Sequence, residues 1–183
     1  MPESIKRFVF FLVSLLTGVA TAAPVDITLV NPSFEAPATG ARAPGWIPTQ
    51  HIGPVRDFEW AVDTETASDG KASYRIKRLT PQVFGMIKQV VVVAEHAGKT
   101  LEFSAAMRTD DVGPEGWLLT VNIESRNAIL EQVRSTPVTG KAGWKRSVLR
   151  FKLPPEAHEL KLGVMLLDEG TGWVDDVKLR VVD

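Results

Sequence analysis

Two adjacent carboxylates, Asp175 and Asp176, lie inside the last β-forming stretch of the chain, residues 170–182. Alternation along a strand predicts that Asp175 points to the same side as Trp173 and Val177, the side expected to face the core. A carboxylate turned inward costs several kcal/mol unless it is ion-paired, hydrogen-bonded or bound to a cation. We therefore predict a structural calcium ion at Asp175. The alternative is that Asp175 lies at the rim of the sheet, near water.

A turn near the other end of the chain offers further oxygen ligands. Residues 31–35, Asn-Pro-Ser-Phe-Glu, follow a short expected strand over residues 25–30. Asn-Pro and Ser favour turns, which leave backbone carbonyl groups unpaired. We predict that Asn31 and Glu35 join Asp175 in the calcium site.

The chain between these ends consists mostly of β-forming runs, separated by turns rich in Gly, Pro and Asp. The expected strands are residues 58–63, 72–78, 84–93, 100–109, 117–124, 129–135, 144–153, 159–167 and 170–182. One helical alternative, residues 82–97, is rejected because its run of four valines is β-branched. Residues 36–54 are expected to form a long crossing loop, pinned by Trp46. About ten strands predict an all-β fold, a two-sheet antiparallel β-sandwich.

Three fragments carry a family resemblance: Asn31–Glu35, Ala97–Ser104 (A-G-K-T-L-E-F-S) and Trp173–Leu179 (W-V-D-D-V-K-L). In this order they resemble carbohydrate-binding modules of families 4 and 9, which are galactose-binding-like jelly rolls. The resemblance spans residues 27–182. It implies that the first and last strands lie side by side, with a structural calcium ion often bound where they meet. It also implies a non-catalytic domain that binds a polysaccharide or oligosaccharide.

The first residues have the pattern of an export signal. Met1–Ala23 has Lys6 and Arg7, then an apolar run from Phe8 to Leu16, and ends in small residues, which is typical of a signal peptide. The apolar run is shorter than the roughly 20 residues of a membrane-spanning helix. We expect a periplasmic or extracellular protein with one domain over residues 24–183 and no membrane span in its mature form.

Charge and cysteine content exclude several classes of function. The formal net charge of the 183 residues is −1, and loss of two basic residues and one acidic residue with the leader changes it to −2. Such a balance does not favour a nucleic-acid partner. With no cysteine, the chain has no disulfide frame, thiol nucleophile or cysteine metal site.

Catalytic patterns are weak. The histidines are His51, His96 and His158; they lie far apart, and none has a ligand spacing such as His-x-x-x-His. The chain has no Gly-x-Ser-x-Gly motif and no Gly-rich phosphate loop. Two separated carboxylates could hydrolyse a glycosidic bond, but a chain with 22 acidic residues always offers such pairs. A small glycoside hydrolase is therefore only a third reading.

Sugar recognition combines flat aromatic rings with polar side chains that bind hydroxyl groups. The resemblance implies packing roles for Trp46, Trp144 and Trp173, and Tyr74 alternates with apolar residues as a core residue would. Trp117 follows the loop of residues 110–116, which would raise it to the rim of a sheet and favours a binding role. Trp60 fits binding and packing equally well.

Polar candidates follow from the same alternation. If Phe103 and Val121 point inward, then Arg108, Asn122 and Glu124 point outward. We predict that the carbohydrate-binding residues are Trp117, Trp60, Arg75, Arg108, Asn122 and Glu124. Such a face could also be an ordinary solvated surface. The positive charges of Arg75 and Arg108 are compatible with an acidic glycan as the ligand.

These observations predict an exported, monomeric, non-catalytic carbohydrate-binding protein with a structural Ca²⁺ ion. The alternative is a structural or protein-interaction β-sandwich domain of the cell envelope without a sugar site.

Overall fold

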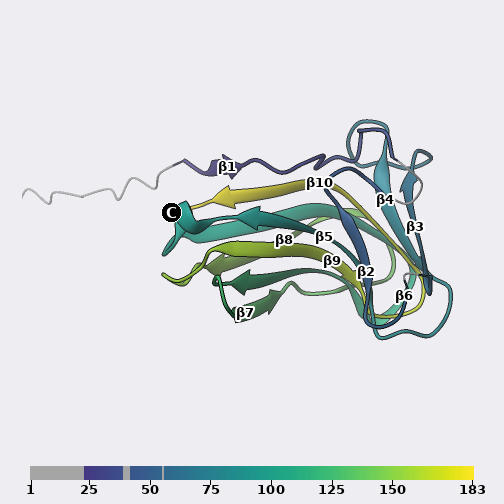
Figure 1. Cartoon of the computed structure of the whole chain (residues 1–183). Helices are drawn as coiled ribbons and strands as arrows, with labels where there is room; N and C mark the ends of the chain where they lie inside the picture. Colours follow the sequence, from purple (N-terminus) through teal and green to yellow (C-terminus); the bar gives the residue numbers. More distant parts are fainter. Residues whose placement is uncertain (1–22, 39–41, 55) are drawn as a thin grey trace, which may run out of the picture.

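The computed structural model describes residues 23–38, 42–54 and 56–183, so the predicted signal peptide lies outside these residues except for Ala23. Over this part, the chain forms ten β-strands and one short 3-10 helix, η1 (Ala94–His96) (Figure 1). The strands are β1 (Val25–Ile27), β2 (Ile47–Gln50), β3 (Phe58–Asp63), β4 (Ser73–Arg78), β5 (Gly85–Val92), β6 (Thr100–Glu124), β7 (Ile129–Arg134), β8 (Val138–Lys152), β9 (Glu159–Leu166) and β10 (Thr171–Val181). The all-β prediction is confirmed.

The long strand β6 belongs to both layers of the fold. Its first part, residues 100–110, pairs with β10 and β8, and its second part, residues 117–124, pairs with β9 and β7. Sheet 1 has the order β3-β4-β10-β6-β8, with β1 beside the end of β10, and sheet 2 has the order β2-β5-β9-β6-β7. All pairings are antiparallel, and the two layers form a β-sandwich of jelly-roll type (Figure 1).

The passage of β6 between the sheets depends on left-handed backbone conformations. Asp111 and Gly116 have φ angles of 56° and 83°, a region that favours glycine because it has no Cβ. A Cβ atom at Gly116 would also collide with Pro137. The chain can therefore turn here without losing strand pairing.

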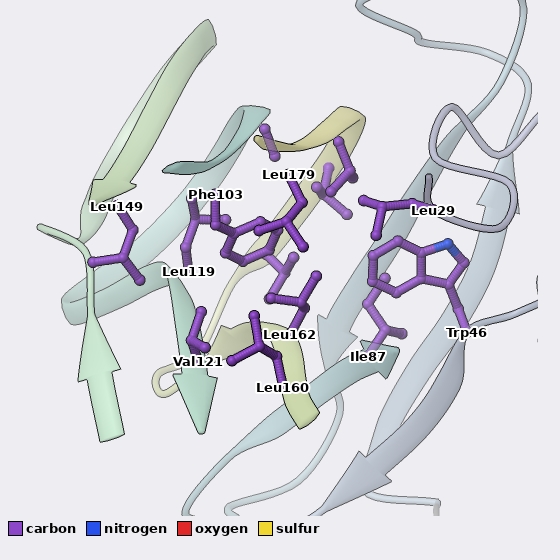
Figure 2. Packing of buried hydrophobic residues seen from close by; sticks show 14 of the residues in the cluster. Leu29, Trp46, Ile87, Phe103, Leu119, Val121, Leu149, Leu160, Leu162 and Leu179 are labelled. Carbon is purple, nitrogen blue, oxygen red and sulfur yellow. The ribbon is translucent and has the colours of Figure 1, made fainter. Parts of the chain in front are cut away.

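The core lies between the two sheets (Figure 2). Phe103 and Leu179 reach it from sheet 1, Leu119 and Leu162 reach it from sheet 2, and each is at most 1% exposed. Full burial of one side chain of this kind stabilises the fold by about 1.5–3 kcal/mol. Trp46, 3% exposed, packs in the same cluster, as expected for the residue that pins the crossing loop.

The first and last strands lie side by side, as the resemblance implied. β1 pairs with β10 from Val25↔Val181 to Ile27↔Leu179. Beyond β1, the Pro32 carbonyl accepts a hydrogen bond from the Val177 N–H at 3.0 Å. The residue 31–35 turn therefore contacts the middle of β10.

A β-bulge in β10 corrects the predicted direction of Asp175. The register with β6 shifts between Asp175 and Lys178, and Asp176 has a φ angle of 46°. Asp175 pairs with Ala106 on the outer side of sheet 1, whereas Val177, beyond the bulge, is a core residue. The inward prediction was wrong because uninterrupted alternation was assumed across the two aspartates.

The sequence pattern missed one edge strand. β2 lies within the segment predicted as a crossing loop and, among the described residues, is an edge strand that pairs with β5. Its four residues, Ile-Pro-Thr-Gln, contain a proline, which is tolerated at a sheet edge but weakens the strand pattern. Over the described ranges, no helix has the length and apolar character needed to cross a membrane.

Candidate binding surface

Asp175 is fully buried although it lies on the outer side of sheet 1. Its Oδ2 accepts the N–H groups of Ser68 and Asp69, both at 2.8 Å, and its Oδ1 accepts the Asp176 N–H at 2.7 Å. Burial raises the pKa of Asp175, and the three N–H groups only partly oppose this rise. The carboxylate therefore anchors the loop between β3 and β4, which covers it.

Glu35 holds the same loop from the other side. Its Oε1 accepts the N–H groups of Lys71 and Ala72 at 2.8 and 2.9 Å. Asn31, the third predicted ligand, accepts the Ala36 N–H through Oδ1 at 3.0 Å. The resemblance was thus a correct guide to where these segments meet.

The chemistry of these three side chains does not fit a calcium cage in the form seen here. In each, a carboxylate or amide oxygen already accepts a hydrogen bond from a backbone N–H group. Among the residues described, no group of three or more His, Cys, Asp or Glu side chains is placed to hold a metal ion. Calcium binding stays a prediction, and nothing in the binding surface below depends on it.

Both predicted binding tryptophans are core residues. Trp117 is 0% exposed, and its Nε1 donates a hydrogen bond to the Trp173 carbonyl at 3.0 Å. Trp60 is 6% exposed and packs against Phe58, with ring centroids 5.4 Å apart. Neither indole presents a face on which a sugar could stack.

The predicted polar residues lie on two different faces. Arg75 and Arg108 are on the outer face of sheet 1, where both flank Trp173. Asn122 and Glu124 are on the outer face of sheet 2 and are engaged with neighbours: Asn122 accepts from Gln132 at 2.8 Å and Glu124 accepts from Lys161 at 2.7 Å. They cannot form one groove, because the core separates the two outer faces.

Only sheet 1 carries tryptophan on its outer face. Of the five tryptophans and one tyrosine of the chain, Trp46, Trp60, Trp117 and Tyr74 are buried in the core. Trp144 and Trp173 are half-buried. The surface with ring stacking available is therefore the one around Trp173, which sequence reasoning assigned to packing.

A row of four side chains crosses sheet 1 from β4 to β8. Trp173 pairs with Arg75 on one side and with Arg108 on the other. Pairings Met107↔Lys145 and Thr109↔Ala142 bracket a bulge that leaves Gly143 and Trp144 opposite Arg108. Because Met107 faces the core, alternation turns Trp144 outward. We call Arg75, Trp173, Arg108 and Trp144 the Trp173 row.

Trp173 is fixed at its ring nitrogen. Its Nε1 donates to Asp63 Oδ2 at 2.8 Å, and the Arg108 guanidinium carbon lies 5.1 Å from the ring centroid, a cation–π contact. Burial alone would raise the pKa of Asp63, but the bonds from Trp173, Glu65 and Thr66 and the charge of Arg75 outweigh it and lower the pKa. Asp63 is therefore ionised at neutral pH, and its hydrogen bond with Trp173 holds the ring in place.

The β3–β4 loop forms one wall of the row. Arg108 Nη1 donates to Thr66 Oγ1 at 2.7 Å, and the Thr66 carbonyl accepts from Ser73 Oγ at 2.7 Å. The same loop is held by Asp175 and Glu35. Asp175 and Glu35, the carboxylates predicted as metal ligands, thus hold in place the loop that borders the Trp173 row.

Two carboxylates beside the row, Glu59 and Asp63, are held by one guanidinium group. Arg75 Nη2 contacts Glu59, and Arg75 Nε lies 3.7 Å from Asp63 Oδ2. The pKa of Asp63 is lowered, whereas the general acid of a glycosidase has a raised pKa. Glu59, Asp63 and Arg75 therefore form an ion-pair network beside the row.

Known proteins share this fold without sharing close sequence. No family model and no curated protein matches the chain. The enzymatically active domain of tailspike protein 4 of bacteriophage CBA120 is 13% identical with a TM-score of 0.63; the match covers 84% of this chain and 21% of that one. A cyclase from Fischerella sp. TAU is 15% identical with a TM-score of 0.61, over 86% of this chain and 97% of the cyclase.

A carbohydrate-binding domain is also among the similar structures. The CBM22-1 xylan-binding domain of Paenibacillus barcinonensis Xyn10C is 17% identical with a TM-score of 0.54, over 88% of this chain and 99% of that domain. At these identities the similarity establishes the fold alone. The chain is a β-sandwich like those of carbohydrate-binding modules, and the matches do not single out families 4 and 9.

Proposed function

We propose that this protein is an exported, non-catalytic carbohydrate-binding protein that holds a polysaccharide or oligosaccharide at the Trp173 row. The observation that carries the proposal is the alternation of arginine and tryptophan along one row of sheet 1. A tryptophan face packs against the apolar face of a pyranose, while guanidinium groups donate to its hydroxyl groups. The similarity to a xylan-binding domain supports this reading.

The finer parts of the proposal concern family, ion and location. Two of the fragments that resemble families 4 and 9 contain Glu35 and Asp175, the residues that hold the β3–β4 loop, which supports that relationship. We propose a monomer that acts in the periplasm or outside the cell. A calcium ion bound only by the folded state would stabilise it by mass action, so a chelator should lower the melting temperature; an unchanged melting curve would count against the ion.

Affinity electrophoresis against a panel of soluble polysaccharides tests the binding function. The purified mature protein should be retarded by at least one polymer. Trp173→Ala should weaken that binding by about 30-fold, since truncation of a central aromatic contact costs about 2 kcal/mol. Trp173→Phe keeps a ring and should lose less.

A control variant separates this surface from the opposite one. Lys88→Ala changes an outward residue of β5 on sheet 2 and should leave retardation unchanged. Absence of retardation by every polymer would argue for the protein-interaction alternative. Equal losses in Trp173→Ala and Lys88→Ala would place the binding elsewhere.

A further inference from the structure

Arg108 differs from the other arginines on the outer face of sheet 1. Each of those has a carboxylate partner: Arg75 with Glu59 and Asp63, Arg146 with Asp176, Arg150 with Glu102, and Arg180 with Asp26. Arg108 contacts the Thr66 hydroxyl and the Trp173 ring. No carboxylate in the described ranges forms an ion pair with it, so its charge is not matched.

The position of Arg108 is costly without an anion. The residue is half-buried between two tryptophans of the row, Trp173 on β10 and Trp144 on β8. Partial burial removes water from the guanidinium group, and the neutral hydroxyl of Thr66 replaces only part of that hydration. Its remaining N–H donors form a planar fork, which matches a carboxylate in a bidentate arrangement.

We propose that the ligand of the Trp173 row is an anionic polysaccharide that contains uronic acid, and that Arg108 binds a uronate carboxylate. This inference rests on the proposed carbohydrate-binding function. Trp173 and Trp144 supply the stacking surface for sugar rings, and Arg108, which lies between them, selects the charged residue of the polymer. Arg75 does not have this role because Glu59 and Asp63 already neutralise it.

The test compares polymers that carry free carboxylates with esterified or neutral counterparts that lack the charge. Homogalacturonan is used with free carboxylates and as its methyl ester, alongside alginate, glucuronoxylan, neutral galactan, neutral xylan and a sulfated dextran. The protein should bind at least one uronate polymer and bind its esterified or neutral counterpart at least tenfold more weakly. Affinity for the uronate polymer should fall as salt rises. Preference for the sulfated dextran over every uronate polymer would overturn the uronate assignment.

Variants then assign the effect to one side chain. Arg108→Gln should lower affinity for the uronate polymer by about 10- to 100-fold, as expected for loss of a charge-assisted bidentate contact. Arg108→Lys should recover part of it. Arg134→Gln is the matched control, because Arg134 lies on the opposite face and contacts only the Gln132 amide among the described side chains; it removes the same charge and should have little effect.

The two levels of failure are distinguishable. One outcome would overturn this inference alone. In it, the protein binds neutral polymers as well as uronate polymers, Trp173→Ala abolishes that binding, and Arg108→Gln leaves it unchanged. The proposed carbohydrate-binding function would then still hold. Equal effects of Arg108→Gln and Arg134→Gln would also overturn this inference. Absence of binding to every polymer would remove both proposals.

Discussion

Replacement of Asp175 by alanine is expected to destabilise the protein more than the same replacement of any exposed carboxylate on sheet 1. The side chain is 0% exposed and accepts three backbone N–H groups. A hydrogen bond to a charged group contributes about 1.5–3 kcal/mol. Two of the three donors, at Ser68 and Asp69, belong to exposed residues, so water can replace part of the loss.

The expected net loss from Asp175→Ala is therefore about 2–4 kcal/mol rather than the sum of three full bonds. For a domain of this size, 1 kcal/mol corresponds to about 2–4 °C, which gives a decrease of about 5–15 °C in melting temperature. Asp175→Asn keeps one carbonyl acceptor and should lose about half as much.

The assay is chemical denaturation followed by far-ultraviolet circular dichroism, with calorimetry as a second measure. Asp110→Ala is the control, because Asp110 lies on the same face and its partner, Lys141 at 2.9 Å, is largely exposed. Such a surface ion pair contributes about 0–1 kcal/mol. If Asp175→Ala cost no more than Asp110→Ala, the role of Asp175 as the anchor of the β3–β4 loop would be refuted.

Two further predictions concern the row and the core beneath it. Because the pKa of Asp63 lies below its ordinary value of 3.8, the stability it contributes is present above about pH 4 and is lost as pH falls through the lowered pKa. The Trp173 indole N–H resonance should shift over the same acid range in NMR spectra, and Asp63→Asn should abolish that shift. Gly172→Ala should cost about 1–3 kcal/mol in denaturation experiments, since a Cβ there would lie 2.6 Å from the Trp117 ring and overpack the core. An unchanged unfolding free energy would contradict the packing seen around Trp117.

Most strands could be predicted because apolar residues alternate along them. β6 shows this in two parts: an apolar residue recurs at every second position over residues 101–107 and again over residues 117–123, and Leu101, Phe103, Leu119 and Val121 are all 0% exposed. Burial of one face is the dominant free-energy term, and it leaves a period of two in the sequence. β2 was missed because a short edge strand needs little apolar content.

The site could not be predicted in full from the same rule. A bulge after Asp175 changes the phase of alternation along β10, so that Trp173 faces outward although Val177 and Leu179 face the core. Trp144 faces outward by the ordinary alternation of β8, but the family resemblance had assigned it to packing. One hint was in the sequence. Gly172 precedes Trp173, and a glycine at an inward position leaves room for a large ring from another strand, here Trp117. The Trp117 ring fills the core space beside Gly172, and the next residue, Trp173, lies on the outer face.

The contacts of Asp175 could not be predicted for a related reason. The sequence gives no view of the β3–β4 loop, whose backbone N–H groups satisfy both Asp175 and Glu35. That loop also presents Thr66 to Arg108. Contacts therefore connect the closure of the sandwich, where β1 pairs with β10, through the β3–β4 loop to Arg108. Arg108 is the arginine of the row that lacks an anionic partner among the described residues. The position of Arg108 depends on this closure, because Asp175 and Glu35, the carboxylates predicted as calcium ligands, stabilise the loop that orients it.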